Sequence, residues 1–247
     1  MRVGIRCAYG PDFWGRVSPC VELGQIELAF YRVEDFLSLN PRRAIVPIKI
    51  LGVKAPSIHL AQAEVSDIGK NDGKFLPVFF KSLDIAVQLG ARLLVVHPTK
   101  GKVSKISPLI DDYLAAILEA LEITLCWETF SGRRRFIGPV ETIAKFVKDR
   151  PFQAICYDTA HVGESTARVL ADAENYGELI KVWHLSNWNE RQRHLPLSHP
   201  EGVLKFEPIL AAIQQYTPDS VVTLEYLKPF HHLLLRDALR IIRMMSP

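Results

Sequence analysis

The 247-residue sequence lacks most features that mark a specialised class of protein. Its four cysteines are widely scattered and form no C-x-x-C pair, which argues against a disulfide framework and against a thiolate zinc site. No apolar run approaches the roughly 20 residues of a membrane-spanning helix, and residues 1–6 lack the apolar core of a signal peptide. We therefore expect a cytoplasmic protein with reduced thiols and no membrane contact.

The sequence also has little excess charge and no glycine-rich nucleotide loop. Its 30 basic and 27 acidic residues give a net charge of +3, whereas a dedicated nucleic-acid binder usually carries a strong basic excess. Neither G-x-G-x-x-G nor G-x-x-x-x-G-K follows a predicted strand, so the dinucleotide-binding and P-loop classes lose their main support. Because no linker or low-complexity stretch divides the chain, we expect residues 1–247 to form a single domain.

What the sequence does contain is a regular alternation of predicted strands and helices. The strands are short β-branched or apolar runs, as expected of strands buried on both faces. We place them at residues 3–7, 25–30, 55–60, 92–97, 123–128, 153–158, 181–185 and 220–225. Helical spacing between most of them, at intervals of roughly 30 residues, predicts βαβ units and a parallel sheet. The segment 42–53 is compatible with either a helix or a strand.

Eight such strands favour the α/β class and closure into a (β/α)8 TIM barrel, with an open doubly wound sheet as the alternative. In a parallel barrel the carboxyl ends of all strands lie on one rim, where the loops build the active site. Six consecutive predicted strands finish on, or within one residue of, a His, Asp or Glu. These residues are His59, His97, Glu128, Asp158, His184 and Glu225. We expect their side chains to converge at the mouth of the barrel.

A divalent cation would explain how acidic side chains can gather there. Carboxylates crowded into one mouth repel each other, and burial raises their pKa unless a cation lies among them. An oxygen-rich set with a single imidazole suits Mn, Mg, Co or Zn. This set consists of Glu128, Asp158, His184 and Glu225. His59 and His97 favour a second, zinc-like position that shares Glu128.

Other residues near the predicted rim are candidates for substrate binding. His161, just beyond the sixth strand, and His194, in the long loop after the seventh, could reach the same cavity. Trp14 follows the first strand, where we expect it to cover the mouth or, if it binds anything, to face a sugar ring. Arg193 and the arginine run 133–135 lie in predicted rim loops and could meet a phosphate.

The alternation of side chains along a strand assigns the neighbouring residues to two faces. Cys126 and Cys156 each stand two residues before a predicted ligand, so we expect them to point toward the barrel axis as small buried hydrophobes. Trp127 and Trp183 should then point outward and pack against the helices.

Several short strings occur in the order and spacing of a known superfamily. They include Ser57-Ile58-His59-Leu60, Val96-His97-Pro98, Trp127-Glu128-Thr129, Tyr157-Asp158-Thr159-Ala160-His161, Trp183-His184-Leu185-Ser186-Asn187 and Leu224-Glu225. Together they resemble the xylose isomerase-like barrel superfamily over most of the chain, from residue 25 to about residue 225. That superfamily contains sugar isomerases and epimerases, and also the endonuclease IV type of apurinic-site nuclease.

The resemblance implies two patterns of metal use. In the epimerases a single metal is held by residues that match the oxygen-rich set, and the residues matching Glu128 and Glu225 move a proton on either side of the substrate carbon. His161 matches a residue that touches the substrate. In the nucleases three zincs are used: His59 and His97 would join Glu128 on the first zinc, and the oxygen-rich set would hold the second.

The third zinc of the nucleases is held by the residue matching His161 and by an Asp-x-His pair. Here that pair reads Gln192-Arg193-His194, with Gln192 where the aspartate belongs. A neutral amide is a poor zinc ligand, so this departure puts a third zinc in doubt.

Three hypotheses follow. The preferred one is a sugar or sugar-phosphate isomerase or epimerase, in which a metal polarises a carbonyl and a carboxylate removes a proton from the adjacent carbon. The alternative is a zinc-dependent hydrolase of abasic DNA, which the four histidines His59, His97, His161 and His194 favour and Gln192 disfavours. The third is a barrel that binds a metal or ligand without catalysis.

Overall fold

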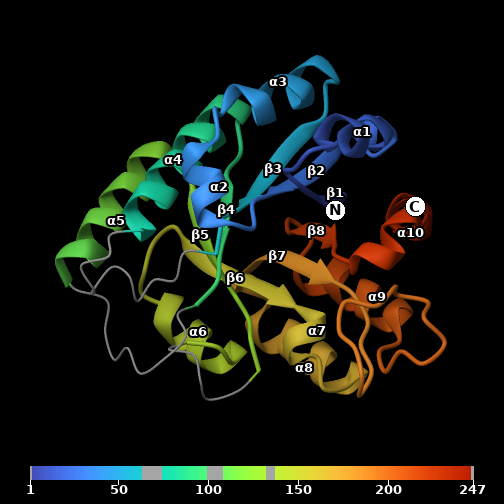
Figure 1. The fold of residues 1–247 in the computed structure, drawn as a ribbon. Helices are drawn as coiled ribbons and strands as arrows, with labels where there is room; N and C mark the ends of the chain where they lie inside the picture. Colours follow the sequence, from blue (N-terminus) through green and yellow to red (C-terminus); the bar gives the residue numbers. More distant parts are fainter. Residues whose placement is uncertain (1, 63–73, 99–107, 132–136, 246–247) are drawn as a thin grey trace.

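Eight parallel strands close into a barrel, shown in Figure 1. The computed structural model describes residues 2–62, 74–98, 108–131 and 137–245. Each strand pairs with its neighbours in sequence, and the last strand pairs with the first, which excludes the open sheet. The strands are β1 (Arg2–Ala8), β2 (Gln25–Ala29), β3 (Lys54–His59), β4 (Leu93–Val96), β5 (Thr124–Glu128), β6 (Gln153–Asp158), β7 (Ile180–Leu185) and β8 (Val221–Leu224).

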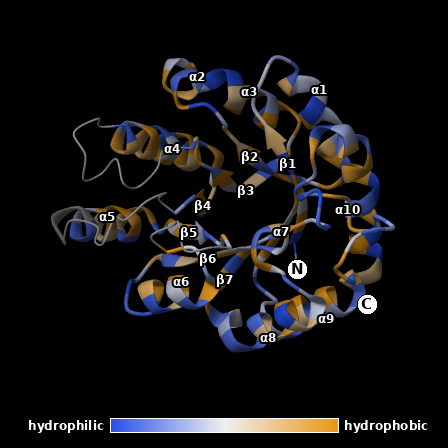
Figure 2. Cartoon of the chain, turned by 60° about the horizontal axis from the view of Figure 1, so that its bottom comes forward, coloured by the Kyte–Doolittle hydropathy of each residue, from blue (hydrophilic) through white to orange (hydrophobic). Residues whose placement is uncertain are grey.

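These strands confirm the predicted TIM barrel, and each end lies within one residue of its predicted position. Helices surround the strands, with their hydrophobic sides turned toward the barrel (Figure 2). They are α1 (Phe13–Val17), α2 (Val33–Ser38), α3 (Arg42–Ile50), α4 (Phe75–Leu89), α5 (Pro108–Leu121), α6 (Val140–Val147), α7 (Thr159–Val162), α8 (Thr166–Tyr176), α9 (Phe206–Tyr216) and α10 (His231–Met245). Short 3-10 turns are η1 (Ser18–Glu22), η3 (Gly177–Leu179) and η4 (Lys228–Phe230).

The ambiguous segment 42–53 forms helix α3, and burial explains why. Ala44 and Ile48 are buried, whereas Val46 and Ile50 are 43% and 68% exposed. In a strand these four residues would share one face, so only the helical period separates buried from exposed positions. Gly52 follows the helix with φ of +67°, a left-handed conformation that glycine adopts without strain, and turns the chain into β3.

The inward and outward faces of the strands divide as expected. Cys126 and Cys156 pack inside the barrel in a small cluster with Val95, Ala154 and Val182. The indoles point outward: the Trp127 ring lies 5.4 Å from that of Phe146 on α6, and Trp183 Nε1 donates to Thr217 Oγ1 at 3.0 Å, just after α9. The next inward positions on β5, β6 and β7 are therefore those of the predicted ligands.

None of the helices in the described ranges has the length and apolar character needed to cross a lipid bilayer.

The packing between strands and helices generates a stability prediction. Ile155 on β6 is fully buried among the outward-facing core residues, so Ile155→Ala leaves a cavity and should lower the free energy of unfolding by about 2–5 kcal/mol. The matched control is Ile50→Ala, which removes the same atoms from an exposed site and should change it by less than ~0.5 kcal/mol. Urea denaturation measures both, and equal losses would contradict the assignment.

Candidate metal centre

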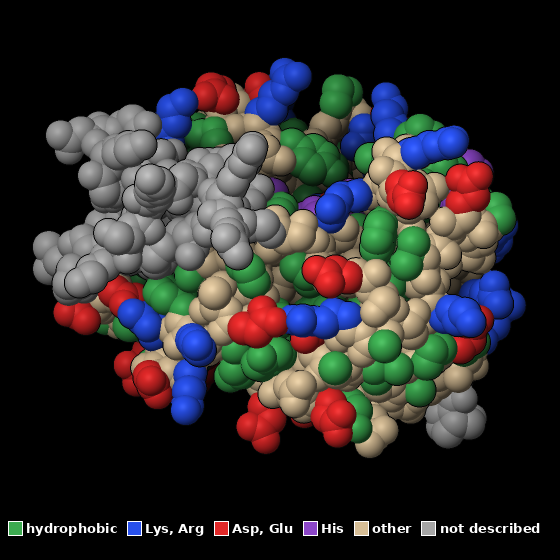
Figure 3. Space-filling model, turned by 90° about the horizontal axis from the view of Figure 1, so that it is seen from below, with side chains coloured by type: hydrophobic (Ala, Val, Ile, Leu, Met, Phe, Trp, Pro, Cys, Tyr) green, Lys and Arg blue, Asp and Glu red, His purple; other side chains and the backbone are tan. Residues whose placement is uncertain are grey.

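A polar cavity of about 260 Å³ opens at the carboxyl ends of the strands. Its lining includes the histidines His59, His97, His161 and His194 and the glutamates Glu128 and Glu225. Histidine side chains are visible beside the hollow on this face of the molecule (Figure 3). Because β strands end here in register, with Asp158 level with His184, the inward side chains of different strands meet at one depth.

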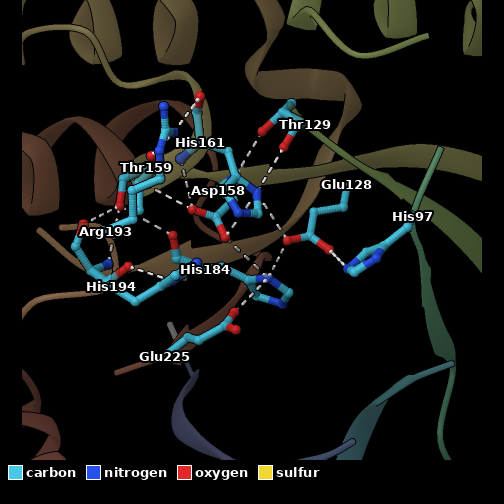
Figure 4. A network of polar contacts seen from close by, with 12 residues as sticks. His97, Glu128, Thr129, Asp158, Thr159, His161, His184, Arg193, His194 and Glu225 are labelled. Carbon is cyan, nitrogen blue, oxygen red and sulfur yellow. Dashed lines mark hydrogen bonds and ion pairs between the residues drawn. The ribbon is translucent and has the colours of Figure 1, made fainter. Parts of the chain in front are cut away.

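The oxygen-rich set predicted from the sequence comes together at the base of this cavity, as Figure 4 shows. One potential ligand atom from each of Glu128, Asp158, His184 and Glu225 lies within 4.8 Å of the others. His184 Nδ1 is 3.5 Å from Glu128 Oε1, 3.5 Å from Glu225 Oε2 and 3.9 Å from Asp158 Oδ2. The donors therefore surround a common point.

Two oxygens of this set show that a cation fits it. Asp158 Oδ2 and Glu225 Oε2 are buried and accept no hydrogen bond from the residues that the structure describes. Burying a carboxylate oxygen without a partner is costly, and a bound cation removes that cost. Three carboxylates with one imidazole are a donor set that divalent metals accept.

A helix cap explains why Asp158 presents only one oxygen to this set. Its Oδ1 accepts the backbone N–H groups of Ala160 and His161, at 2.8 and 3.2 Å, at the start of α7. This cap fixes the side chain and leaves Oδ2 facing the other ligands. Burial raises the pKa of the Asp158 carboxyl, and the neighbouring His161 and His194 only partly offset that rise.

His59, His97 and Glu128 form a second group of donors. Glu128 Oε2 lies 3.0 Å from His59 Nε2 and 2.7 Å from His97 Nε2. His59 Nδ1 is 3.0 Å from the carbonyl oxygen of Leu60, so it carries the proton and Nε2 faces the carboxylate. Burial, reinforced by the charge of Arg6, lowers the pKa of His59, which favours the neutral form that metals bind.

Asp158, His161 and His194 form a third group. Gln192 is not part of it: this residue is exposed and makes a turn, in which its backbone pairs with that of Asn189. The structure thus brings the two histidines together with Asp158 and leaves Gln192 exposed, and a neutral amide is a poor zinc ligand.

Glu128 is common to the first two groups, and its surroundings keep it ionised. Burial alone would raise its pKa, but the charge of His97 and the close imidazoles of His161, His184 and His59 hold the pKa of Glu128 well below its usual range. The carboxylate is therefore an anion that could serve both groups of potential ligands.

Sequence reasoning missed two residues that support the site, Arg6 and Glu27. Glu27 accepts hydrogen bonds from Arg6 Nε at 3.0 Å, Ser57 Oγ at 3.0 Å and His184 Nε2 at 3.2 Å. Since Nε2 of His184 donates to Glu27, its Nδ1 faces the ligand set. A charged residue at an inward position of a buried strand was the signal that could have revealed both.

The electrostatics of Glu27 agree with this role. Burial would raise its pKa, but the charge of His184, a hydrogen bond from His184 and the charge of Arg6 together hold the pKa of Glu27 far below its usual value. Glu27 thus stays a carboxylate that can accept the His184 proton.

Other predicted substrate contacts are not gathered at the cavity. Trp14 lies in the first turn of α1 and is 48% exposed, and it is not among the residues that line the cavity. Arg193 donates instead to the carbonyl oxygens of Ala160 and His161. The arginine run 133–135 lies outside the described residues.

A sequence profile of the xylose isomerase-like TIM barrel family, also called AP endonuclease 2, matches residues 52–244. The chain belongs to this family. The match covers more than half of the chain and includes every ligand named above. Among curated protein sequences, none matches this chain significantly.

Solved structures show the same fold at low sequence identity. 3-Keto-D-glucoside 4-epimerase from E. coli has a TM-score of 0.75 and 14% identity, with 99% of each chain covered. D-Allulose 3-epimerase from Methylomonas sp., solved with D-allulose, has a TM-score of 0.69 and 14% identity over 100% of this chain and 97% of that one. Endonuclease IV from Thermus thermophilus has a TM-score of 0.68 and 19% identity over 99% of this chain and 100% of that one.

Glu128 belongs to both the oxygen-rich set and the group with His59 and His97, and this generates a prediction. Glu128→Gln replaces an anion by a neutral amide in both groups, so the affinity for Zn²⁺ or Mn²⁺ should fall by at least about tenfold. The matched control is Glu174→Gln on the exposed surface of α8, which should bind metal like the unchanged protein. Isothermal titration calorimetry measures both. Undiminished metal binding by Glu128→Gln would contradict the assignment of this residue.

Proposed function

We propose that the protein is a metal-dependent sugar or sugar-phosphate isomerase or epimerase. The observation that carries this proposal is that only two of the four residues in the oxygen-rich set line the cavity. Glu128 and Glu225 line the cavity, whereas Asp158 and His184 are fully buried and do not line it. Two carboxylates thus face the space where a substrate would lie, and the other two ligands anchor the centre from below.

The residues present assign a role to each part of the site. Glu128, Asp158, His184 and Glu225 would hold a divalent cation, with His59 and His97 available for a second. Such a cation would polarise a substrate carbonyl and make the neighbouring C–H bond more acidic. His161 and His194 line the cavity and would hydrogen-bond sugar hydroxyls. A cavity of about 260 Å³, just below the ~300–1,000 Å³ of most ligand sites, suits a small molecule such as a monosaccharide.

Proton transfer would fall to the two glutamates. A carboxylate removes a proton from the carbon beside a carbonyl, and a second group returns a proton to complete an isomerisation or an epimerisation. Glu128 and Glu225 both line the cavity, so their carboxylates would lie beside a bound substrate. The similar epimerase structures support this chemistry.

Solvent isotope exchange tests the proposal. The protein, loaded with Mn²⁺, Co²⁺, Mg²⁺ or Zn²⁺, should incorporate deuterium from D₂O into at least one member of a panel of ketoses and ketose phosphates, as detected by mass spectrometry and NMR. Glu225→Gln should lose this exchange because an amide cannot accept the proton, while Glu174→Gln should retain it. An absence of exchange across the whole panel and all four metals would argue decisively against the proposal.

The second candidate is a zinc-dependent nuclease of abasic DNA. The two additional donor groups, His59 with His97 and His161 with His194, favour it because that reaction uses several zincs. Metal analysis after dialysis, combined with a cleavage assay on an abasic duplex, separates the candidates. Two or three zincs per chain with cleavage would replace the first proposal by this one. One metal without cleavage removes the nuclease, and metal binding without either reaction indicates a non-catalytic barrel.

A further inference from the structure

Arg6 brings a permanent positive charge into the ring of ligands. It comes from β1, where it pairs in register with Glu27, and its side chain is only 6% exposed. Nε donates to Glu27 Oε1 at 3.0 Å, and Nη1 donates to Glu225 Oε1. Nη2 lies 3.2 Å from His184 Nδ1. A guanidinium cannot lose its proton in a protein, so this charge is present at every pH at which the barrel is folded.

Two of these contacts fall on proposed metal ligands. Because His184 Nε2 faces Glu27, Nδ1 is the ring atom that faces the ligand set. Arg6 Nη2 lies against Nδ1, in the place that a metal bound by this ring would take. The guanidinium and a metal cannot both occupy that place. Glu225 is divided in the same way, since Oε1 is held by Arg6 and Oε2 is left toward the ligand set.

The charges around Arg6 also set it against a bound divalent cation. Arg6 compensates the buried carboxylates Glu27 and Glu225, which would otherwise repel each other and the rest of the ring. A divalent cation that enters beside Glu225 meets a like charge already in place, and in a buried site this repulsion is weakly screened. One side chain therefore stabilises the metal-free site and opposes its loading.

We propose that Arg6 is a built-in counter-ion that competes with the divalent cation for Glu225 and His184, so that it lowers metal affinity and keeps the site formed without metal. This inference rests on the metal centre of the proposed function but not on its reaction. Loading requires Arg6 to move away from His184 Nδ1 while it keeps Glu27.

Titration of Arg6→Met with Zn²⁺ and Mn²⁺ tests the proposal. Methionine has similar length without charge, so the dissociation constant should fall at least about tenfold. The melting temperature of the metal-free variant should fall by several degrees, and the rise on metal addition should exceed that of the unchanged protein. Arg6→Lys keeps the charge and should stay within about threefold of the unchanged affinity. Arg16→Met removes an exposed residue's guanidinium that donates to the Ala8 carbonyl oxygen outside the ring, and should leave the metal affinity unchanged.

The outcomes separate this inference from the proposed function. Equal or weaker metal binding by Arg6→Met overturns the role of Arg6 and leaves the metal centre intact. Absence of metal binding in both the unchanged protein and Arg6→Met overturns the centre and the inference together. If Arg6→Met folds only in the presence of metal, that result supports the counter-ion role.

A measurement on the unchanged protein decides the case even if Arg6→Met does not fold at all. The Arg6 Nε–H signal, assigned by its loss in the ¹⁵N spectrum of Arg6→Lys, should shift on addition of one equivalent of Zn²⁺ because the guanidinium moves away from His184 and a doubly charged ion takes its place. The signals of exposed arginines such as Arg16 should stay in place. An Arg6 signal that does not move while zinc binds would refute the competition.

Discussion

The site depends on one constraint, which is that several carboxylates are buried together at one mouth of a barrel. Glu27, Glu128 and Asp158 are nearly or completely inaccessible to water, and Glu225 joins them at the edge of the cavity. Such a cluster is stable only with compensating positive charge or hydrogen-bond donors. The histidines supply part of this compensation around Glu128, Arg6 supplies part around Glu27 and Glu225, and unpartnered oxygens on Asp158 and Glu225 leave room for a cation.

The barrel supplies the geometry that this cluster needs. Strands in parallel register bring Asp158 level with His184, and side-chain alternation turns both inward above the buried Cys156 and Val182. The cap at α7 then fixes one oxygen of Asp158, and Glu27 fixes the proton on His184. Each ligand is thus held by a second interaction before any substrate or metal contributes, which is how a rigid scaffold preorganises a functional site.

The comparison with known proteins shows that the barrel and the side chains on its rim have separate roles. This chain shares its fold with two sugar epimerases at 14% identity and with an endonuclease IV at 19% identity. A fold that supports such different chemistries decides where the active site lies, whereas the side chains on the rim decide the reaction. Here the exposed Gln192, in place of an acidic ligand, and the charge of Arg6 inside the ring are the features of this chain that bear on that choice.

The sequence by itself determined the order of strands and helices and the six candidate ligands at the strand ends, because hydrophobic periodicity and strand ends are local properties, and it favoured a closed barrel without excluding an open sheet. It left segment 42–53 open and did not single out Arg6 or Glu27, because an inward charge on one strand does not show which residues of other strands it meets. Only the tertiary structure decided that Arg6 reaches across to Glu225, 219 positions away, and that Trp14 and Arg193 are not among the residues that line the cavity. Contacts between residues so far apart arise from barrel closure, which joins β8 to β1 and which no local pattern encodes.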